Sequence, residues 1–334
     1  MEHRPGLAPA VAEIRRALRA CLAAADTDAV VLGLSGGADS LALAAALAFE
    51  APKAGVRAVA VVVDHGLQPG SAEVAARAAD AARGRGLDAE VVAVRVDPAG
   101  DGLEAAARDA RRAALRAAAV RHGAGGILLA HTLDDQAETV LLGLARGSGS
   151  TSLGGMAPVV QDVGIRWLRP LLGIRRDVTR AACAADGLEP WDDPHNADPR
   201  FARVRVRQSV LPTLERELGP GVAEALARTA DQLREDADAF AAMIDETIED
   251  IVEPAEAGIA VSVAALAANP PALRHRIIRH VVRSEFHTSL TRTQTLEVAR
   301  LVTDWAGQGP IDLPGCRARR VGRAIEFTAP DPAL

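Results

Sequence analysis

The sequence predicts an α/β protein in which a doubly wound parallel sheet is followed by a smaller, mainly helical C-terminal domain. Short runs rich in Val, Ile and Leu alternate with longer Ala- and Arg-rich segments whose apolar residues recur at helical spacing. Strands that alternate with helices form parallel sheets covered by helices on both faces. The length of 334 residues is sufficient for two domains with separate cores.

The predicted elements of the first domain follow the chain in order. Buried strands are expected at 29–34, 58–63, 89–96 and 126–130. Helices are expected at 40–50, 72–85, 103–121 and 133–144. A further strand and helix are expected within 165–187, and a short helix after the loop that starts at Trp191.

The second domain is expected to begin near the sequence LGPG at 218–221, which is typical of a boundary. We therefore place the domains at 1–217 and 218–334. The second domain should contain a long acidic helix, a pair of helices and a β-ribbon near 311–327.

Charge is distributed in blocks along the chain. The formal net charge of −6 argues weakly against a nucleic-acid partner. Residues 221–256, however, carry eleven carboxylates and two arginines, whereas residues 271–334 carry ten arginines and six carboxylates. Because aromatic residues make up only 2% of the chain, any nucleic-acid contact must depend on charge, and the basic C-terminal block is the candidate.

The three cysteines, Cys21, Cys183 and Cys316, are too far apart in sequence to form a CxxC pair or a Cys-rich metal site. The N-terminus lacks the apolar core of a signal peptide, and no stretch has the ~20 apolar residues of a membrane span. We therefore expect a soluble, cytoplasmic protein with no membrane partner.

The loop after the first predicted strand carries the clearest chemical signal, in the sequence VVLGLSGGADS. A strand followed by Ser35, Gly36 and Gly37, with a helix restarting near Ser40, directs free backbone N–H groups at a small anion. Asp39 adds a carboxylate for a metal ion, and the lysine of a Walker A loop is missing. The alternative is a tight turn with no ligand.

Two further segments place acidic side chains beside this loop. Asp64 ends the second strand and could contact a ribose or an adenine amine, or merely cap a turn. Asp134, Asp135 and Glu138 crowd one face at the start of the helix at 133–144. Complementing the helix dipole would account for one or two of these three carboxylates, and the third suggests a bound cation.

These motifs resemble those of known enzymes. SGGADS resembles the PP-loop of the ATP pyrophosphatases, which cleave ATP to AMP and pyrophosphate while adenylating a substrate. The sequence from residue 25 to 215 resembles the tRNA(Ile)-lysidine synthases more specifically. The matching positions are His131, Asp134, Asp135, Gln136, Glu138, Thr139, 146–149, 169–172, Asp193, Pro194, Asn196, Phe201, Arg203, Arg205 and Arg207.

This resemblance implies a reaction in which ATP, with Mg²⁺, adenylates the wobble cytidine of tRNA(Ile) with a CAU anticodon. Free lysine then displaces AMP to give lysidine. The implied ATP-binding residues are Ser35, Gly36, Gly37, Asp39, Ser40 and Asp64, with Asp39 as metal ligand. The implied catalytic residues are Asp39, Asp135 and Arg205, and the implied lysine-binding residues are Asp134 and Glu138. The sequence alone does not divide the roles of the three helix carboxylates.

The resemblance also implies that Arg108, His131, Arg203 and Arg207 contact the target cytidine or the tRNA. Arg108 and Glu104 could equally form an ion pair on a solvated helix face. Arg203, Arg205 and Arg207 would point the same way in an extended segment but spread around a helix. Val204 replaces the Asn that the family usually has at this position.

The basic C-terminal segment is expected to hold tRNA phosphates through Arg317, Arg319, Arg320 and Arg323, unless these arginines pair with carboxylates or only solvate the ribbon. Three other functions remain: an amidating relative, a tRNA-thiolating relative and a non-catalytic RNA-binding module. The thiolating relative would need cysteine pairs that this chain lacks. The sequence leaves a homodimer open.

Overall fold

The computed structural model describes residues 6–97, 102–147, 149–193, 197–255 and 258–330. The chain forms two compact units, Met1–Arg234 and Glu235–Leu334. The division lies within a long helix, so it comes later than the predicted boundary at 217/218. The first part of that helix belongs to unit 1 because Ala223 and Ala227 pack against Leu133, Ala137 and Leu211.

Unit 1 is built on a six-stranded sheet in the order β3-β2-β1-β4-β6-β5. All neighbouring strands are parallel except β5 and β6, which form an antiparallel pair. The strands are β1 (Ala29–Leu34), β2 (Arg57–Asp64), β3 (Asp88–Ala93), β4 (Gly126–Leu128), β5 (Val159–Asp162) and β6 (Ile165–Leu168). This arrangement confirms the predicted doubly wound sheet.

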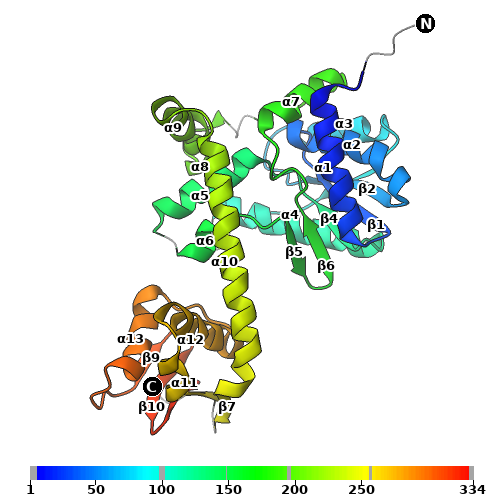
Figure 1. Cartoon of the computed structure of the whole chain (residues 1–334). Coiled ribbons are helices and arrows are strands. Elements are labelled where there is room, and N and C mark those ends of the chain that lie inside the picture. The colour runs from blue at the N-terminus through cyan, green and yellow to red at the C-terminus, as the bar shows by residue number, and fades with distance from the viewer. Residues whose placement is uncertain (1–5, 98–101, 148, 194–196, 256–257, 331–334) are drawn as a thin grey trace, which may run out of the picture. The chain divides into compact units, whose positions relative to one another are not determined.

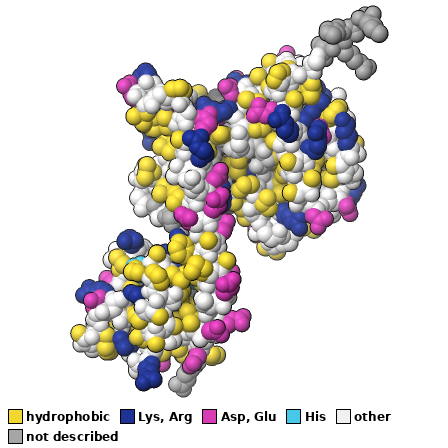
Figure 2. All heavy atoms as spheres, viewed as in Figure 1, with side chains coloured by type: hydrophobic (Ala, Val, Ile, Leu, Met, Phe, Trp, Pro, Cys, Tyr) yellow, Lys and Arg dark blue, Asp and Glu magenta, His cyan; other side chains and the backbone are white. Residues whose placement is uncertain are grey.

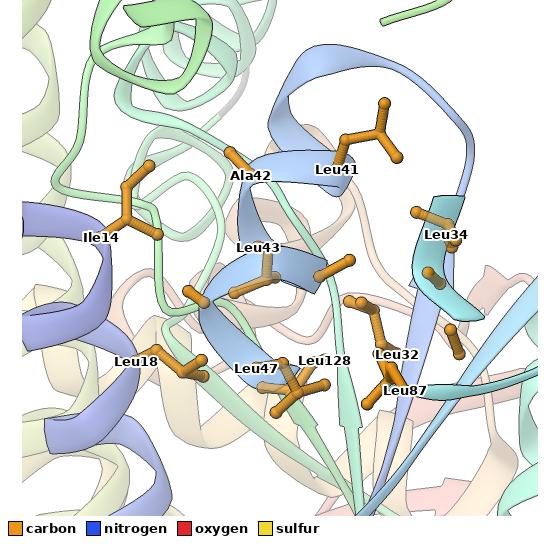
Figure 3. Packing of buried hydrophobic residues seen from close by; sticks show 14 of the residues in the cluster. Ile14, Leu18, Leu32, Leu34, Leu41, Ala42, Leu43, Leu47, Leu87 and Leu128 are labelled. Carbon is orange, nitrogen blue, oxygen red and sulfur yellow. The ribbon is translucent and has the colours of Figure 1, made fainter. Parts of the chain in front are cut away.

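Alternate residues of the strands pack against helices on opposite faces. Val30 and Leu32 of β1 join the core formed with α1 (Pro9–Ala25), α2 (Ala38–Glu50), α3 (Ser71–Arg83) and α7 (Arg176–Ala185). Val31 joins the core formed with α4 (Leu103–Arg121) on the other face. This period-two alternation explains why the predicted strands are apolar throughout. Figure 3 shows Leu18, Leu43 and Leu32 from three elements of the first core.

The remaining helices of unit 1 are α5 (Leu133–Ala145), α6 (Ser150–Leu153), α8 (Ala202–Arg205), the π-helical turn η3 (Val206–Val210) and α9 (Leu211–Leu218), with a short 3₁₀ turn, η1 (Pro52–Ala54), after α2. Of these, α5 and α8 carry Glu138 and Arg203 of the candidate site. The π turn precedes Pro212, whose nitrogen cannot donate the hydrogen bond of a regular α-helix.

Unit 2 contains a five-stranded sheet in the order β7-β8-β11-β10-β9, with every neighbouring pair antiparallel. The strands are β7 (Val252–Ala255), β8 (Gly258–Ser262), β9 (Ile311–Leu313), β10 (Cys316–Val321) and β11 (Ala324–Thr328). Its helices are the last part of α10 (Val222–Ile251), α11 (Val263–Ala268), α12 (Pro271–Phe286) and α13 (Arg292–Thr303) (Figure 1).

The core of unit 2 joins α12 and α13 to the sheet through residues such as Ile277, Val298 and Phe327. The expected long acidic helix, helix pair and C-terminal ribbon are therefore present, and Figure 2 shows the acidic side chains in a row along α10. None of the helices in the described ranges is both long and apolar enough to cross a membrane.

Candidate active site

The site lies where the sheet reverses its strand order. The chain passes from β1 outward to β2 and β3, then returns to place β4 on the other side of β1. In open parallel sheets, ligands bind at the carboxyl ends of the strands at such a switch point. The segment after β1 is the glycine-bearing loop, and the segment after β4 leads into the acidic start of α5. The topology therefore brings the two predicted motifs together.

The glycine-bearing loop is held in shape by its own serines. Ser35 N–H donates to Ser40 Oγ at 3.2 Å, the two hydroxyl oxygens are 3.0 Å apart, and Ser40 Oγ donates to Gly37 O. Gly36 has φ +82°, a conformation that favours glycine. No described side chain caps α2 after Gly37. The first N–H groups of this helix are thus oriented for an anion at the switch point.

Asp39, in the first turn of α2, faces α7. Its carboxylate accepts a hydrogen bond from the Thr179 hydroxyl and lies 3.5 Å from Arg176 Nε. Burial raises the pKa of Asp39, and the charge of Asp135 adds to this effect against the contributions of Thr179 and Arg176. Asp39 and Asp135 therefore lie close enough to interact electrostatically.

Asp135 has two separate roles. Its Oδ2 accepts from the N–H of Thr132 at 2.8 Å and completes a capping box at the start of α5. Its Oδ1 accepts from Arg176 Nη2 at 2.7 Å and from Arg207 Nη2 at 3.3 Å. Burial alone would raise the pKa of Asp135. The charge of Arg176 and the hydrogen bond from the Thr132 N–H outweigh burial and hold this pKa below its usual value. The carboxylate is therefore ionised and well solvated by protein donors.

Arg176 links the carboxylates of α2 and α5. Its guanidinium contacts Asp39, Asp135 and Glu138, the last at 3.3 Å, while its backbone N–H donates to Asp134 at 2.8 Å. Burial opposes the charge on Arg176, but Asp135, Glu138 and Asp39 outweigh it and raise its pKa. Arg176 is thus a permanent cation at the centre of the site.

Glu138 is fully buried and surrounded by arginines. Arg207 donates from Nε to Oε1 at 2.7 Å and from Nη2 to Oε2 at 3.0 Å, and Arg203 Nε lies 3.6 Å from Oε2. The same Arg203 also donates to the Thr139 hydroxyl at 3.0 Å. The predicted gathering of Asp134, Asp135 and Glu138 is therefore present, but arginines occupy the space facing them.

These guanidiniums occupy the space between the carboxylates, and a cavity in unit 1 lies elsewhere. It has a volume of about 720 Å³ and is lined by residues including Cys21 of α1, Leu133 of α5 and Glu224 of α10. None of the phosphate-loop residues, all of which the structure describes, lines this cavity. The candidate site is thus defined by chemistry and topology rather than by an empty pocket.

The three alternating arginines are helical, and they do spread around the axis. Arg203 and Arg207, one turn apart, face Glu138. Arg205 points elsewhere and donates to the carbonyl groups of Pro199 and Arg200 at 2.7 and 2.8 Å. Val204 is buried, so its side chain serves packing. The structure does not bring Arg205 to the carboxylate cluster, and its catalytic role stays a prediction.

Two histidines border the loop. His131 follows β4, and His65 follows β2; each has a buried Nδ1 without a hydrogen-bond partner in the described part of the chain. Burial, aided by Arg169 and Arg111, lowers the pKa of His131 to about 4 despite the opposing charge of Asp135. His131 is therefore neutral at pH 7. Burial and Arg111 also lower the pKa of His65.

The other predicted residues have less distinctive surroundings. The Asp64 carboxylate accepts from the Gly66 N–H at 2.9 Å, as expected for a turn cap. Arg108 is exposed on α4, whereas Arg111, one turn later, acts electrostatically on both histidines. The side chain of Glu104, like Ser148, Pro194 and Asn196 of the sequence motifs, lies outside the described residues.

Sequence reasoning missed Arg176 and Thr179 as members of the site. The available signal was the run IRRDVT shortly after the matched residues 169–172, which places an arginine at the start of a helix near the switch point. Gln136, a motif residue, has a structural role, because its side-chain amide accepts from Met156 N at 2.7 Å and donates to Met156 O at 2.9 Å.

The residues present fit a magnesium ion shared with a nucleotide. Mg²⁺ is commonly held by one or two carboxylates together with substrate phosphates. Asp39 and Asp135 supply such carboxylates, and Arg176 lies between them as a cation. The described residues contain no cluster of three or more metal-binding side chains, so the protein could supply only part of a coordination shell.

A switch-point loop of this kind, with free helix N–H groups and neighbouring carboxylates, defines a nucleotide-binding α/β enzyme of the PP-loop class. A family model described as the PP-loop domain matches residues 11–214, and one described as the TilS substrate binding domain matches residues 262–325. The chain thus has both parts that these models describe.

The chain belongs to the tRNA(Ile)-lysidine synthase family. It is 63% identical over 300 residues to the tRNA(Ile)-lysidine synthase of Leifsonia xyli subsp. xyli, covering 89% of each chain. It is 53% identical to that of Streptomyces coelicolor, covering 88% of this chain and 83% of the relative. It is 49% identical to that of Thermobifida fusca, covering 94% of this chain and 96% of the relative.

A solved structure supports the fold assignment. The U34-tRNA thiolase NcsA from Methanococcus maripaludis matches with a TM-score of 0.58 and 20% identity, over 68% of this chain and 79% of the thiolase. At this identity the likeness concerns the fold alone.

The three cysteines of this chain, Cys21, Cys183 and Cys316, are free thiols, and burial raises the pKa of each to about 11.

Proposed function

We propose that the protein uses ATP to attach free lysine to the 2-position of the wobble cytidine of tRNA(Ile) with a CAU anticodon. In the first step, the cytidine 2-oxygen attacks the α-phosphate of ATP and pyrophosphate leaves. In the second, the ε-amine of lysine attacks the C2 carbon, the C2–oxygen bond to AMP breaks, and the amine proton passes to a base. The products are lysidine, AMP and pyrophosphate.

The observation that carries this proposal is the juxtaposition of the phosphate loop with the Asp135–Glu138 carboxylates in a chain of this family. The loop Ser35–Ser40 would receive the nucleotide phosphates on its N–H groups and hydroxyls. A bound Mg²⁺ would offset the charge developing on pyrophosphate. Arg176, held beside Asp39, would provide a fixed positive charge for the same purpose.

The lysine subsite would be formed by Asp134, Asp135 and Glu138. Three carboxylates favour an ammonium group, and Asp135 is the candidate to accept the amine proton. Glu138 has no exposed surface, and Arg207 holds both of its oxygens. Lysine would therefore reach Glu138 only after a guanidinium moves, so that one cation replaces another and the buried carboxylate stays neutralised.

The target base would be bound near His131. A neutral imidazole whose Nδ1 has no partner among the described residues is available to hydrogen-bond a base. Arg203, and Arg108 as implied by the family motif, would contact the cytidine or the adjacent phosphates. The C-terminal unit would hold the body of the tRNA through charge.

The experiment that tests the proposal is mass spectrometry of the anticodon nucleosides of tRNA(Ile) after incubation with protein, ATP, Mg²⁺ and lysine. We expect lysidine, with one AMP and one pyrophosphate released per nucleoside formed. Omitting lysine should leave pyrophosphate release but no lysidine. Incorporation of sulfur or ammonia, or tRNA binding without ATP cleavage, would contradict the proposal and favour another PP-loop ligase or a binding module.

A further inference from the structure

One side of α12 in unit 2 carries arginines away from the core. Arg279 and Arg283 are four residues apart, so they lie on one side of the helix, about 6 Å apart along its axis. The opposite side is buried in the core of unit 2, through Leu273, Ile277, Ile278, Val281 and Val282. Arg276, one turn earlier, stacks over the ring of Phe240 at 4.4 Å and is thereby engaged within the unit.

The start of α13 adds a third cation, Arg292. The pKa of Arg279 is lowered mainly by burial. The charges of Arg276 and Arg292 lower it further. Burial and the charges of Arg279, Arg274 and Arg292 lower the pKa of His275. The electrostatic contributions to both shifts come from arginines alone. We call Arg279, Arg283 and Arg292 the α12 patch.

Several other arginines pair with carboxylates. On β10, Arg317 Nε lies 2.7 Å from Asp312, and Arg319 Nη2 lies 2.8 Å from Glu326. In unit 1, Arg175 pairs with Asp134, Glu215 and Glu224, and Arg180 with Asp192. The α12 patch differs from these pairs, because within the described ranges none of its three arginines has a carboxylate partner, and Arg279 and Arg292 repel one another.

The position of Arg292 adds a second unfavourable interaction. It is the first residue of α13, directly after the capping Thr291. The N-terminus of a helix carries partial positive charge and disfavours a cation. Charges that oppose the stability of the unit are best explained by an anionic ligand, because the ligand supplies the missing counter-charge.

We propose that the α12 patch is the surface through which unit 2 holds the phosphate backbone of the substrate RNA. This inference rests on the proposed function. The patch lies within residues 262–325, which match the substrate binding domain model. Arginine binds phosphate with paired hydrogen bonds, and several arginines on one surface fit neighbouring phosphates of one strand. Arg317 and Arg319 of β10, which pair with Asp312 and Glu326, contribute less.

The test compares two double variants of the full-length protein that remove equal charge. Arg279→Gln with Arg292→Gln neutralises most of the patch, and Arg317→Gln with Arg319→Gln removes the two ribbon arginines that pair with carboxylates. Binding of tRNA(Ile) transcript is measured as a function of salt. We expect the patch variant to bind roughly tenfold more weakly at about 0.1 M salt, with a salt slope flatter by about two units. The ribbon variant should keep the wild-type affinity and slope.

Thermal unfolding of the same proteins separates the patch from a structural role. The patch variant should melt at the same temperature as the wild type or higher, since its substitutions relieve repulsion. Arg279 is half-buried, so its substitution could disturb packing. A second patch variant, Arg283→Gln with Arg292→Gln, therefore changes two exposed arginines instead. Weaker RNA binding with undiminished stability in either version supports the proposal.

Two outcomes would overturn the inference. One is a folded patch variant with wild-type affinity and slope, and the other is an equal loss in the ribbon variant. Either could accompany normal lysidine formation by the wild type, in which case the proposed function stands and only the patch is rejected. Wild-type protein that neither binds this tRNA nor forms lysidine would reject the proposed function itself.

Discussion

Arg207 binds Glu138 with two hydrogen bonds, from Nε to Oε1 at 2.7 Å and from Nη2 to Oε2 at 3.0 Å. Glu138 has no exposed surface, and Arg176 Nη1 lies 3.3 Å from the same Oε1. The carboxylate is therefore saturated by cations of its own chain. Any substrate cation at this position competes with arginine, and the consequences can be measured.

Glu138→Gln should raise KM for lysine more than KM for ATP, because it removes the charge expected to face the ammonium. It also leaves two largely buried guanidiniums short of counter-charge, which should lower the free energy of unfolding by about 3 kcal/mol. Steady-state kinetics of lysidine formation at varied lysine and ATP concentrations give the two KM values, and urea unfolding gives the free energy of unfolding. Equal increases of both KM values would instead assign Glu138 a structural role.

Asp39→Ala should reduce ATP-dependent pyrophosphate release by at least about a hundredfold while the protein remains folded, because the loop loses the carboxylate that we propose binds the metal ion. Thr179→Ala is the comparison variant, since it removes the hydroxyl that donates to Asp39 and leaves the Asp39 carboxylate in place. This variant should retain most of the activity. Near-normal pyrophosphate release by a folded Asp39→Ala protein would refute the assignment.

Arg176→Lys should lower kcat by roughly a hundredfold, because a single ammonium cannot contact Asp39, Asp135 and Glu138 together. Arg180→Lys, on the same helix, changes an exposed arginine paired with the exposed Asp192 and should have no effect. Single-turnover pyrophosphate release measures both. Similar activities of the two variants would show that Arg176 only holds the carboxylates in place.

Arg205 and Arg207 allow the family-derived role of Arg205 to be tested directly. Arg207→Gln should impair lysidine formation strongly, since Arg207 contacts Asp135 and Glu138. Arg205→Gln should reduce lysidine formation by less than about tenfold if the contacts of Arg205 with the carbonyls of Pro199 and Arg200 persist during the reaction of the wild type. A large loss for Arg205→Gln in lysidine yield would mean that this side chain turns toward substrate when tRNA binds.

His131 should make the stability of the protein depend on pH. Its pKa is about 4 in the folded protein, below the ordinary value near 6.5. Between these values the unfolded chain binds a proton that the folded chain does not, so stability falls as the pH drops. The loss at pH 5 is about 2 kcal/mol. Urea unfolding at pH 7.5 and pH 5 should therefore show a smaller difference in His131→Asn than in the wild type; an unchanged difference would contradict this.

Much of the fold follows from the sequence because the sheet of unit 1 is covered on both faces. Its central strands are continuous apolar runs, and they are easily distinguished from the helices. The short strands β7 and β8 lack such a signal, because β7 is a four-residue segment interrupted by Pro254 and neither strand has a long apolar run. The place of the site is also predictable, since strand ends and the glycine loop meet at the switch point.

The contacts within the site are not predictable from the sequence. Arg176 meets Glu138 across 38 residues of chain, and no local spacing encodes such a contact. The orientation of Arg203, Arg205 and Arg207 depends on whether the segment is extended or helical, which alternation alone does not decide. The pairing of Arg317 with Asp312 and of Arg319 with Glu326 likewise arises only once the strands lie side by side.

The arrangement of the site depends on the number of residues in the π turn at Val206–Val210. A π turn holds one residue more than an α-helical turn, so deleting Val206 would restore an ordinary helix and leave Leu211, beyond the turn, facing Leu133 and Ala137. Arg207, within the turn, would instead be rotated by about 100° relative to Arg203 upstream. A chain shortened by this one residue could keep every arginine and carboxylate and still lose their arrangement.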